Sequence, residues 1–200
     1  MKAIWATLMC ACLGGAGCGA GDGAMDASRP DSAPHDASGE DAGVALPGCA
    51  GAGLLELGRC ELPGGGQCTG TPDEGGLFVS LTPGDSVPVV RGPQGFQMLI
   101  FAARTRGIAA GDPSMPSSSA NPRLELHLLD ASGTEQSLYR GRSAFLPEEG
   151  APDRFFNAGL FVVVDPAATG LSGAEADVLG KLTDATGELR CGSVHVFVSP

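Results

Sequence analysis

Apolar and polar side chains alternate along several short segments of this chain. In residues 123–130 (RLELHLLD), Leu124, Leu126 and Leu128 alternate with polar residues, and valines repeat the pattern within residues 188–199. A period of two places the apolar side chains on one face of a β-strand and the polar ones on the other. We therefore expect half-exposed strands here. Further strand signals cover residues 54–57, 77–81, 86–91, 136–140 and 175–184.

Two other segments are apolar at nearly every position. Residues 96–104 read FQMLIFAAR, and residues 155–165 read FFNAGLFVVVD. Continuous apolar runs of this length fit strands that are covered on both faces, or a buried helix. The Gly-Pro-Gln-Gly turn at residues 92–95 directly precedes the first run and favours a strand.

Turn-forming residues separate the predicted strands. Asp-Ala-Ser-Gly at residues 130–133 and Asp-Ala-Thr-Gly at residues 184–187 are typical of hairpin turns. Glycine accepts a positive φ there, and the aspartate bonds to nearby backbone N–H groups. Polar composition predicts loops at residues 111–122 and 148–154, and Pro88 indicates an edge strand or the start of a strand.

The order of these elements predicts an all-β domain. No segment spaces its apolar residues by three and four over three turns, so we expect no helix beyond one turn at residues 166–173. About eight or nine short strands over about 150 residues predict an antiparallel β-sandwich. We expect an immunoglobulin-like or fibronectin-type arrangement, with a jelly roll as the alternative. The buried tryptophan of antibody domains is missing, because the only tryptophan is Trp5.

Charge changes the picture in two ways. Residues 19–47 carry six acids and one arginine with hardly a large apolar side chain, so this segment cannot offset the entropy of ordering and should be a disordered tether. The whole chain has 23 acidic and 12 basic residues, a formal net charge of −11. This balance argues against nucleic acid as a partner, which calls for clustered Lys and Arg, and against electrostatic binding to anionic lipid.

Residues 1–17 have the features of a secretory signal. Lys2 is followed by an apolar run of about 11 residues and then by small residues. The run is too short for a bilayer, which takes roughly 20 apolar residues. Two small residues precede Cys18, and this arrangement resembles the lipobox of bacterial lipoproteins, in which a diacylglycerol is attached to the cysteine. Gly15 departs from the Leu, Val or Ile usual in that family, and Cys12 is a poorer match. The alternative is an ordinary signal, cleaved near Cys18 without lipid.

Cysteine parity favours a lipid on Cys18. The chain has seven cysteines, two of them inside the predicted signal. With Cys18 lipidated an even set of four remains, whereas an unlipidated Cys18 would leave one thiol without a partner. The spacings within the set fit no common zinc-ligand pair, so we expect disulfides, with three connectivities open. Any bond to the last cysteine would tie the start of the domain to its last strand. The disulfide candidates are Cys49, Cys60, Cys68 and Cys191.

One internal segment carries a further resemblance. Residues 89–112, VVRGPQGFQMLIFAARTRGIAAGD, resemble a recurring segment of uncharacterised predicted lipoproteins from GC-rich bacteria. In that group the Gly-Pro-Gln-Gly turn leads into a strand that often carries His and Trp. Here Gln97, Met98, Leu99 and Ile100 occupy the region. The resemblance implies a secreted sandwich and no known activity.

The sequence carries no catalytic motif. Ser172 lacks the Gly-x-Ser-x-Gly form of many serine hydrolases. The domain's two histidines, His127 and His195, are predicted on the polar faces of strands as solvated side chains. A metal site would need their strands to be adjacent with a carboxylate nearby, such as Glu125. No pair stands out for glycosidase chemistry among Glu148, Glu149, Asp153 and Asp165. We expect Arg104, Arg106, Arg140 and Arg142 to be solvated rather than to converge on an acidic partner.

These observations predict a signal peptide (residues 1–17), a lipidated cysteine with a tether (18–47) and a β-sandwich (48–200). We expect a non-enzymatic cell-envelope protein without a cofactor or metal, anchored to a membrane by lipid, with a binding or structural role. The residue after Cys18 is Gly19, not the aspartate that resembles a signal for retention in the inner membrane. This difference favours the outer membrane. The sequence specifies no protein or glycan partner. The alternative is a secreted hydrolase or metal-dependent enzyme with a site built from loops such as residues 148–154.

Overall fold

The computed structural model describes residues 46, 48–50, 52–68, 76–92, 94–164 and 171–200. The predicted signal, Cys18, the tether and most of the predicted helical turn lie outside these ranges. In this part of the chain all regular secondary structure is strand, and no helix could cross a bilayer. The strands are β1 (Gly53–Glu61), β2 (Leu77–Ser80), β3 (Asp85–Pro88), β4 (Val90–Arg91), β5 (Gln97–Arg106), β6 (Arg123–Asp130), β7 (Glu135–Arg142), β8 (Leu146–Glu148), β9 (Ala151–Val164), β10 (Ala174–Thr183) and β11 (Leu189–Ser199).

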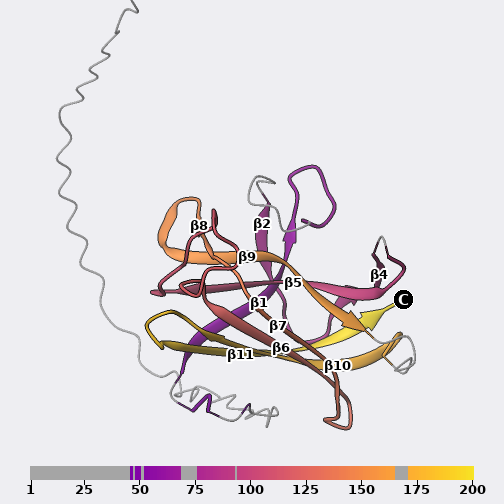
Figure 1. Ribbon diagram of the computed structural model, residues 1–200. Helices are drawn as coiled ribbons and strands as arrows, with labels where there is room; N and C mark the ends of the chain where they lie inside the picture. The colour runs from indigo at the N-terminus through magenta and orange to yellow at the C-terminus, as the bar shows by residue number, and fades with distance from the viewer. Residues whose placement is uncertain (1–45, 47, 51, 69–75, 93, 165–170) are drawn as a thin grey trace, which may run out of the picture. The chain divides into compact units, whose positions relative to one another are not determined.

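The strands form two layers that share β1. One layer has the order β7-β6-β10-β11 with β3 beside β11, and the other has the order β1-β5-β9-β8 with β2 on β1 and β4 on β5. Figure 1 shows β6, β7, β10 and β11 below β5, β8 and β9. Gly53 and Leu54 of β1 pair in parallel with β11, and the next residues pair antiparallel with β5. The expected all-β fold is confirmed. β11 is parallel to both β1 and β3, and the other paired strands are antiparallel.

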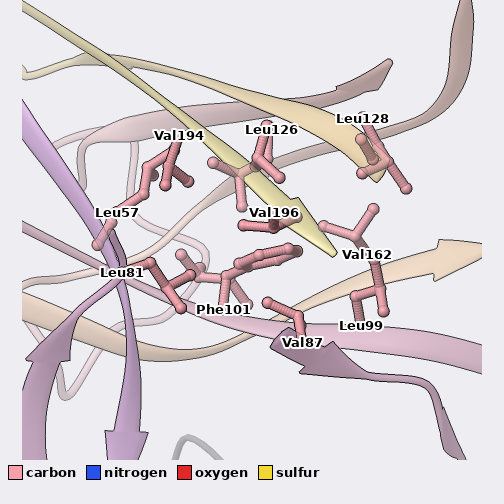
Figure 2. Packing of buried hydrophobic residues seen from close by; sticks show 14 of the residues in the cluster. Leu57, Leu81, Val87, Leu99, Phe101, Leu126, Leu128, Val162, Val194 and Val196 are labelled. Carbon is pink, nitrogen blue, oxygen red and sulfur yellow. The ribbon is translucent and has the colours of Figure 1, made fainter. Parts of the chain in front are cut away.

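The main core lies between these layers, on the faces that the alternating pattern predicts. Leu126 of β6 and Val196 of β11 are fully buried, and Figure 2 shows them opposite Leu99 and Phe101 of β5. The polar residues between them point to the outer faces, because successive side chains of a strand alternate. The hydrophobic pattern therefore determined which face of each strand is buried.

The apolar run of β5 is covered on both faces over only part of its length. Phe101 and Ala103 face the main core, and Ala102 between them is also fully buried. Met98 and Ile100, on the same outer face as Ala102, are half-buried. The prediction of two covered faces is therefore confirmed around Ala102 and not at the start of the strand.

The predicted strand at residues 86–91 is divided in two. Val87 pairs with Val198 of β11, whereas Val90 pairs with Met98 of β5, so the chain changes layers between them. Pro88, which lacks a backbone N–H, is the last residue of β3. The change of layer follows the proline, in agreement with its predicted position at a strand boundary.

The prediction of a loop at residues 148–154 is wrong. Glu148 is the last residue of β8 and Ala151 is the first residue of β9, so only Glu149 and Gly150 connect the two strands. Gly150 has a φ of 76°, the left-handed conformation that glycine accepts without strain. The polar residues that suggested a loop belong to an exposed β-hairpin instead.

Candidate functional site

A second, smaller apolar cluster lies on the outer face of β5, away from the main core. Its buried members are Ala102 of β5, Cys60 of β1 and Cys68. Phe78 of β2 and Phe156 of β9 pack onto this group from either side. This cluster lies on the face of β5 that points away from the main core. Cys68, in the segment after β1, covers the sheet there.

A cavity of about 590 Å³ opens beside this cluster. This volume falls in the range of about 300–1,000 Å³ that is usual for small-molecule pockets. In Figure 1 β2 and β8, which both contribute to its wall, lie at the same end of the upper layer. The apolar wall includes Leu77 and Phe78 of β2, Leu146 of β8, Phe156 of β9, and Pro113 and Pro116 of the loop before β6.

A disulfide forms part of the cavity wall. Cys60 and Cys68 are bonded to each other, and both line the cavity together with Gly76. A Cβ atom on Gly76 would lie 2.1 Å from the Cys68 sulfur and 2.3 Å from the Cys60 sulfur. Only glycine lets the backbone pass so close to the bridge, so Gly76 and the disulfide together define this side of the cavity.

The loop that carries the two wall prolines is held in place by Asn121. The Asn121 side chain is fully buried. Its Nδ2 donates to the carbonyl oxygens of Met115 (2.8 Å) and Pro116 (3.2 Å), and its Oδ1 accepts from the N–H of Asp112 at 2.7 Å. The guanidinium of Arg142 donates to the Asn121 carbonyl oxygen at 2.8 Å. A buried side chain with three backbone partners fixes the loop, so this wall of the cavity is preformed.

Four polar residues complete the described lining. Asn157 is almost fully buried, and its Nδ2 donates to the Ser143 hydroxyl (2.6 Å) and the Ala144 carbonyl oxygen (2.7 Å). Glu148 and Glu149 lie at the end of the β8–β9 hairpin. A mostly apolar wall with a few fixed polar groups is the usual composition of a ligand pocket.

An ion-pair network connects the cavity wall to the outer face of β5. The Arg104 Nη2 atom lies 2.5 Å from Glu56 Oε2, and its Nη1 atom lies 3.3 Å from Glu148 Oε1. The same guanidinium stacks over the Phe78 ring, with Cζ 4.2 Å from the ring centroid. Arg104 therefore fixes one carboxylate and one aromatic ring of the wall at once.

Hydrogen bonds determine the electrostatics at the centre of this network. Burial would raise the pKa of Glu56, but the hydrogen bonds and charge of Arg104, with the Ser80 hydroxyl, keep it below its ordinary value of 4.5.

Glu148 also pairs with a second arginine: Arg154 Nη1 lies 3.5 Å from Glu148 Oε2. Glu148 Oε2 and Arg154 Nε are buried with no hydrogen-bond partner among the described residues. Two arginines and two glutamates thus balance one another beside the cavity.

The four domain cysteines form two disulfides. Cys49 is bonded to Cys191, with a sequence separation of 142, and Cys60 is bonded to Cys68, with a separation of 8. This confirms the expectation of disulfides and selects one of the three open connectivities. The first bond ties the start of the domain to its last strand, as expected for any partner of Cys191. Disulfides persist in oxidising compartments, which places the domain outside the reducing cytoplasm.

The two histidines do not come together in one site. His127 lies on β6 and His195 on β11, and β10 runs between these strands. His127 Nδ1 lies 2.5 Å from Glu135 Oε2, whereas His195 Nδ1 lies 2.9 Å from Asp177 Oδ1. Within the described ranges, no three His, Cys, Asp or Glu side chains are placed to hold a metal ion.

The four arginines singled out in the sequence have four different environments. Arg104 is largely buried in the network beside the cavity, which differs from the solvated position that we expected. Arg106 pairs with Asp153, and Arg140 pairs with Glu125. Arg142 donates to backbone carbonyl oxygens of the loop before β6.

Sequence reasoning did not identify the wall residues of the cavity. From the strand pattern alone, Phe78 and Phe156 could equally be core residues. Asn157 belongs to no recognisable sequence motif. The one available signal was Arg104, the charged residue that ends the mainly apolar run of residues 96–104. A charge in such a run indicates a partner on the neighbouring strands, which is what the structure places there.

Comparisons with known proteins add little to this geometry. No protein-family model matches the sequence, and no curated protein matches it. Among solved structures, the chain is similar to the crystal structure of CopC from Methylosinus trichosporium OB3b, with 14% sequence identity and a TM-score of 0.27. The match covers 60% of this chain and 86% of the other. A likeness of this size establishes neither the family nor the function of the chain.

Proposed function

We propose that this chain is an exported lipoprotein whose β-domain binds small apolar molecules in the cavity beside the Cys60–Cys68 bridge. The observation that carries the proposal is the cavity itself: about 590 Å³, walled by Phe78, Phe156 and aliphatic side chains, with few polar groups. The apolar wall supplies affinity, because it removes apolar ligand surface from water. Among the described lining residues no nucleophile is paired with a base, and we propose a binding module without enzymatic activity, anchored in the outer membrane.

A fluorescence titration with Nile red, a neutral apolar dye, tests the binding site. The whole exported chain bearing Cys18→Ala is suitable, because this substitution removes the proposed lipid and with it the need for detergent. We expect saturable binding of one dye per chain. Ala158→Leu, which adds volume at a lining position, should weaken the binding by about tenfold.

A matched variant identifies the cavity as the site. Val163 lies on the outer surface of β9, is 48% exposed and does not line the cavity. Val163→Ser removes exposed apolar surface while leaving the cavity unchanged, so the dye should bind as to the parent chain. Loss of binding in Val163→Ser, with full binding in Ala158→Leu, would place the dye on the sheet surface and reject the proposal.

The lipid anchor is a separate part of the proposal. With both disulfides formed, all four domain cysteines are used, and Cys18 is the remaining cysteine after the predicted signal. Labelling with radioactive palmitate in the native host should mark the wild-type chain and not Cys18→Ala. Equal label in both chains, or in neither, would reject lipidation at Cys18. Fractionation of the labelled cells then tests the outer membrane as the location.

A further inference from the structure

The ionisable residues of the cavity lining have one sign of charge. In the described part of the lining they are Glu148 and Glu149, with no lysine or arginine. A charged group of a ligand bound in the cavity would interact with these carboxylates. Whether the protein itself compensates the negative charge of each glutamate therefore decides which ligand charge the cavity favours.

Glu148 is already balanced by the protein. Its Oε1 atom lies 3.3 Å from Arg104 Nη1, and its Oε2 atom lies 3.5 Å from Arg154 Nη1. Arg104 also pairs with Glu56, so two arginines and two glutamates share this network. This group of four charges sums to zero and offers no net attraction to an ion.

Glu149 is the carboxylate that remains for a ligand. Its side chain is exposed, and it forms no ion pair with the described part of the chain. It stands in the two-residue β8–β9 turn, next to the paired Glu148. The edge of the cavity thus carries one uncompensated negative charge directly beside an apolar wall.

A second carboxylate lies on the loop that supplies the two wall prolines. Asp112 directly precedes Pro113, a wall residue, and also forms no ion pair within the described ranges. Its Oδ1 accepts hydrogen bonds from the hydroxyl and the N–H of Ser114, and these bonds keep its pKa below 3.8. Asp112 is therefore ionised at neutral pH, in the loop that Asn121 holds against the cavity.

We propose that the cavity binds small cationic amphiphiles, with the apolar body against Phe78, Leu146 and Phe156 and the cation beside Glu149. The ligand class is an aliphatic or aromatic group that carries one protonated amine or quaternary ammonium. This inference rests on the proposed function, since it assigns the ligand of the same cavity. Anionic amphiphiles with the same body would place their charge beside Glu149 and bind more weakly.

A series of ligands with one tail and three head groups tests the assignment. Decyltrimethylammonium, decanol and decyl sulfate, each below its micelle-forming concentration, compete with Nile red for the whole chain bearing Cys18→Ala. We expect the ammonium compound to bind about 1.4- to fivefold more tightly than the alcohol, and the sulfate to bind most weakly, because an exposed ion pair contributes about 0.2–1 kcal/mol. The preference should shrink in 0.5 M salt, as expected for a solvent-exposed charge.

Two variants distinguish the head group from the tail. Glu149→Gln should abolish the preference for the ammonium compound while leaving the affinity for decanol unchanged. Glu188→Gln removes an exposed glutamate on the β10–β11 turn, which does not line the cavity, and should leave the preference intact. A preference that survives Glu149→Gln would overturn the assignment to this residue.

The remaining outcomes separate this inference from the proposed function. Equal affinities for all three head groups in the unmodified cavity would overturn the cationic specificity and retain the apolar site. Failure of every compound, and of the dye, to bind would overturn both.

Discussion

The Oδ2 atom of Asp184 accepts a hydrogen bond from the backbone N–H of Ala109 at 2.8 Å, across 75 residues of sequence. The Oδ1 atom of the same carboxylate closes its own turn, accepting from the N–H and the hydroxyl of Thr186 and from the N–H of Glu188. One side chain thus holds the β10–β11 turn and attaches it to the segment that follows β5. Asp130 closes the β6–β7 turn in the same way, and among the described residues no distant backbone group bonds to it.

The two turns make a matched pair for mutagenesis. Asp184 is 5% exposed, so Asp184→Ala leaves several part-buried N–H groups without their acceptor and should lower the free energy of unfolding by about 2–4 kcal/mol. Asp130→Ala, in a solvent-exposed turn, should cost clearly less, because water can replace the lost acceptor. Urea denaturation of the two variants measures the difference, and equal losses would contradict a structural role for the Ala109 contact.

Acid should reproduce part of the Asp184 effect. Burial would raise the pKa of Asp184, but the hydrogen bonds from Ala109, Thr186 and Glu188 outweigh it and keep the pKa below 3.8. A carboxyl group with a lowered pKa in the folded state stabilises the protein above about pH 4, and this contribution is lost as the pH falls through the folded-state value. Stability measured between pH 6 and pH 2 should therefore decline less steeply in Asp184→Ala than in the parent chain. Parallel slopes would show that the carboxylate titrates alike in the folded and unfolded states.

Two paired glycines allow β1 to pass between the layers. A Cβ atom on Gly192 of β11 would lie 1.8 Å from the Leu55 carbonyl oxygen, whereas one on Gly180 of β10 would meet only the ends of leucine side chains, at 2.9 and 3.0 Å. Gly192→Ala should therefore lower the stability by about 3 kcal/mol or more, because backbone must move, and Gly180→Ala by about 1–2 kcal/mol. Gly64→Ala is the control, since nothing lies within 4 Å of its Cβ position. Thermal unfolding ranks the three variants, and a mild Gly192→Ala would contradict the close approach of β1 and β11.

The sequence predicted what depends on neighbouring residues. The alternating leucines of β6 placed Leu124, Leu126 and Leu128 in the core, and the Asp-Ala-Ser-Gly and Asp-Ala-Thr-Gly turns each contain a glycine with positive φ. Burial of one face and the preference of glycine for left-handed backbone act over a few residues, so they leave a readable pattern. The residue boundaries of β6 agree with the prediction for the same reason.

Features that depend on distant residues left no such pattern. The two aspartate turns have nearly the same sequence, yet only Asp184 meets Ala109, because β5 ends beside that turn. Arg104 and Glu148 are 44 residues apart, and the cavity beside them exists only once β2, β8 and β9 come together. The layer change of β1 likewise requires Gly192 of the last strand. These contacts follow from topology, which composition and periodicity do not specify.

The two disulfides should differ in what their removal changes. On the chain-entropy account, a bond with a sequence separation of 142 stabilises by roughly 5 kcal/mol and one with a separation of 8 by roughly 2.5 kcal/mol. Replacing Cys49 and Cys191 by serine should therefore reduce stability more than replacing Cys60 and Cys68. Denaturant unfolding measures this order, and the reverse order would show that the short bridge holds more of the fold than its loop length implies.

The two disulfides should rank in the opposite order for their effect on ligand binding: removing Cys60–Cys68 should weaken binding more than removing Cys49–Cys191. Cys60 and Cys68 line the cavity, whereas Cys49 and Cys191 do not. In denaturant-free buffer, serine at positions 60 and 68 should weaken Nile red binding by about tenfold or more, because the wall at Gly76 loses its support. Serine at positions 49 and 191 should leave the affinity of the folded fraction unchanged. Loss of binding in the second variant alone would separate the dye site from the cavity.

His195 provides a pH-dependent contact on the outer face of the layer formed by β7, β6, β10 and β11. The hydrogen bond and charge of Asp177, with Glu175 further away, outweigh partial burial and raise the pKa of His195 above 6.5. Asp177→Asn should lower this pKa towards 6.5, and Glu175→Gln should lower it less, since the Glu175 carboxylate lies 3.6 Å from Nε2. An NMR titration of the imidazole measures both shifts. Because the folded-state pKa is raised, the pair stabilises the domain fully below about pH 6.5 and less as the pH rises through the folded value. Since the imidazole is 41% exposed, the change in stability should be small. If Asp177→Asn leaves the His195 pKa unchanged, the 2.9 Å contact does not persist in solution.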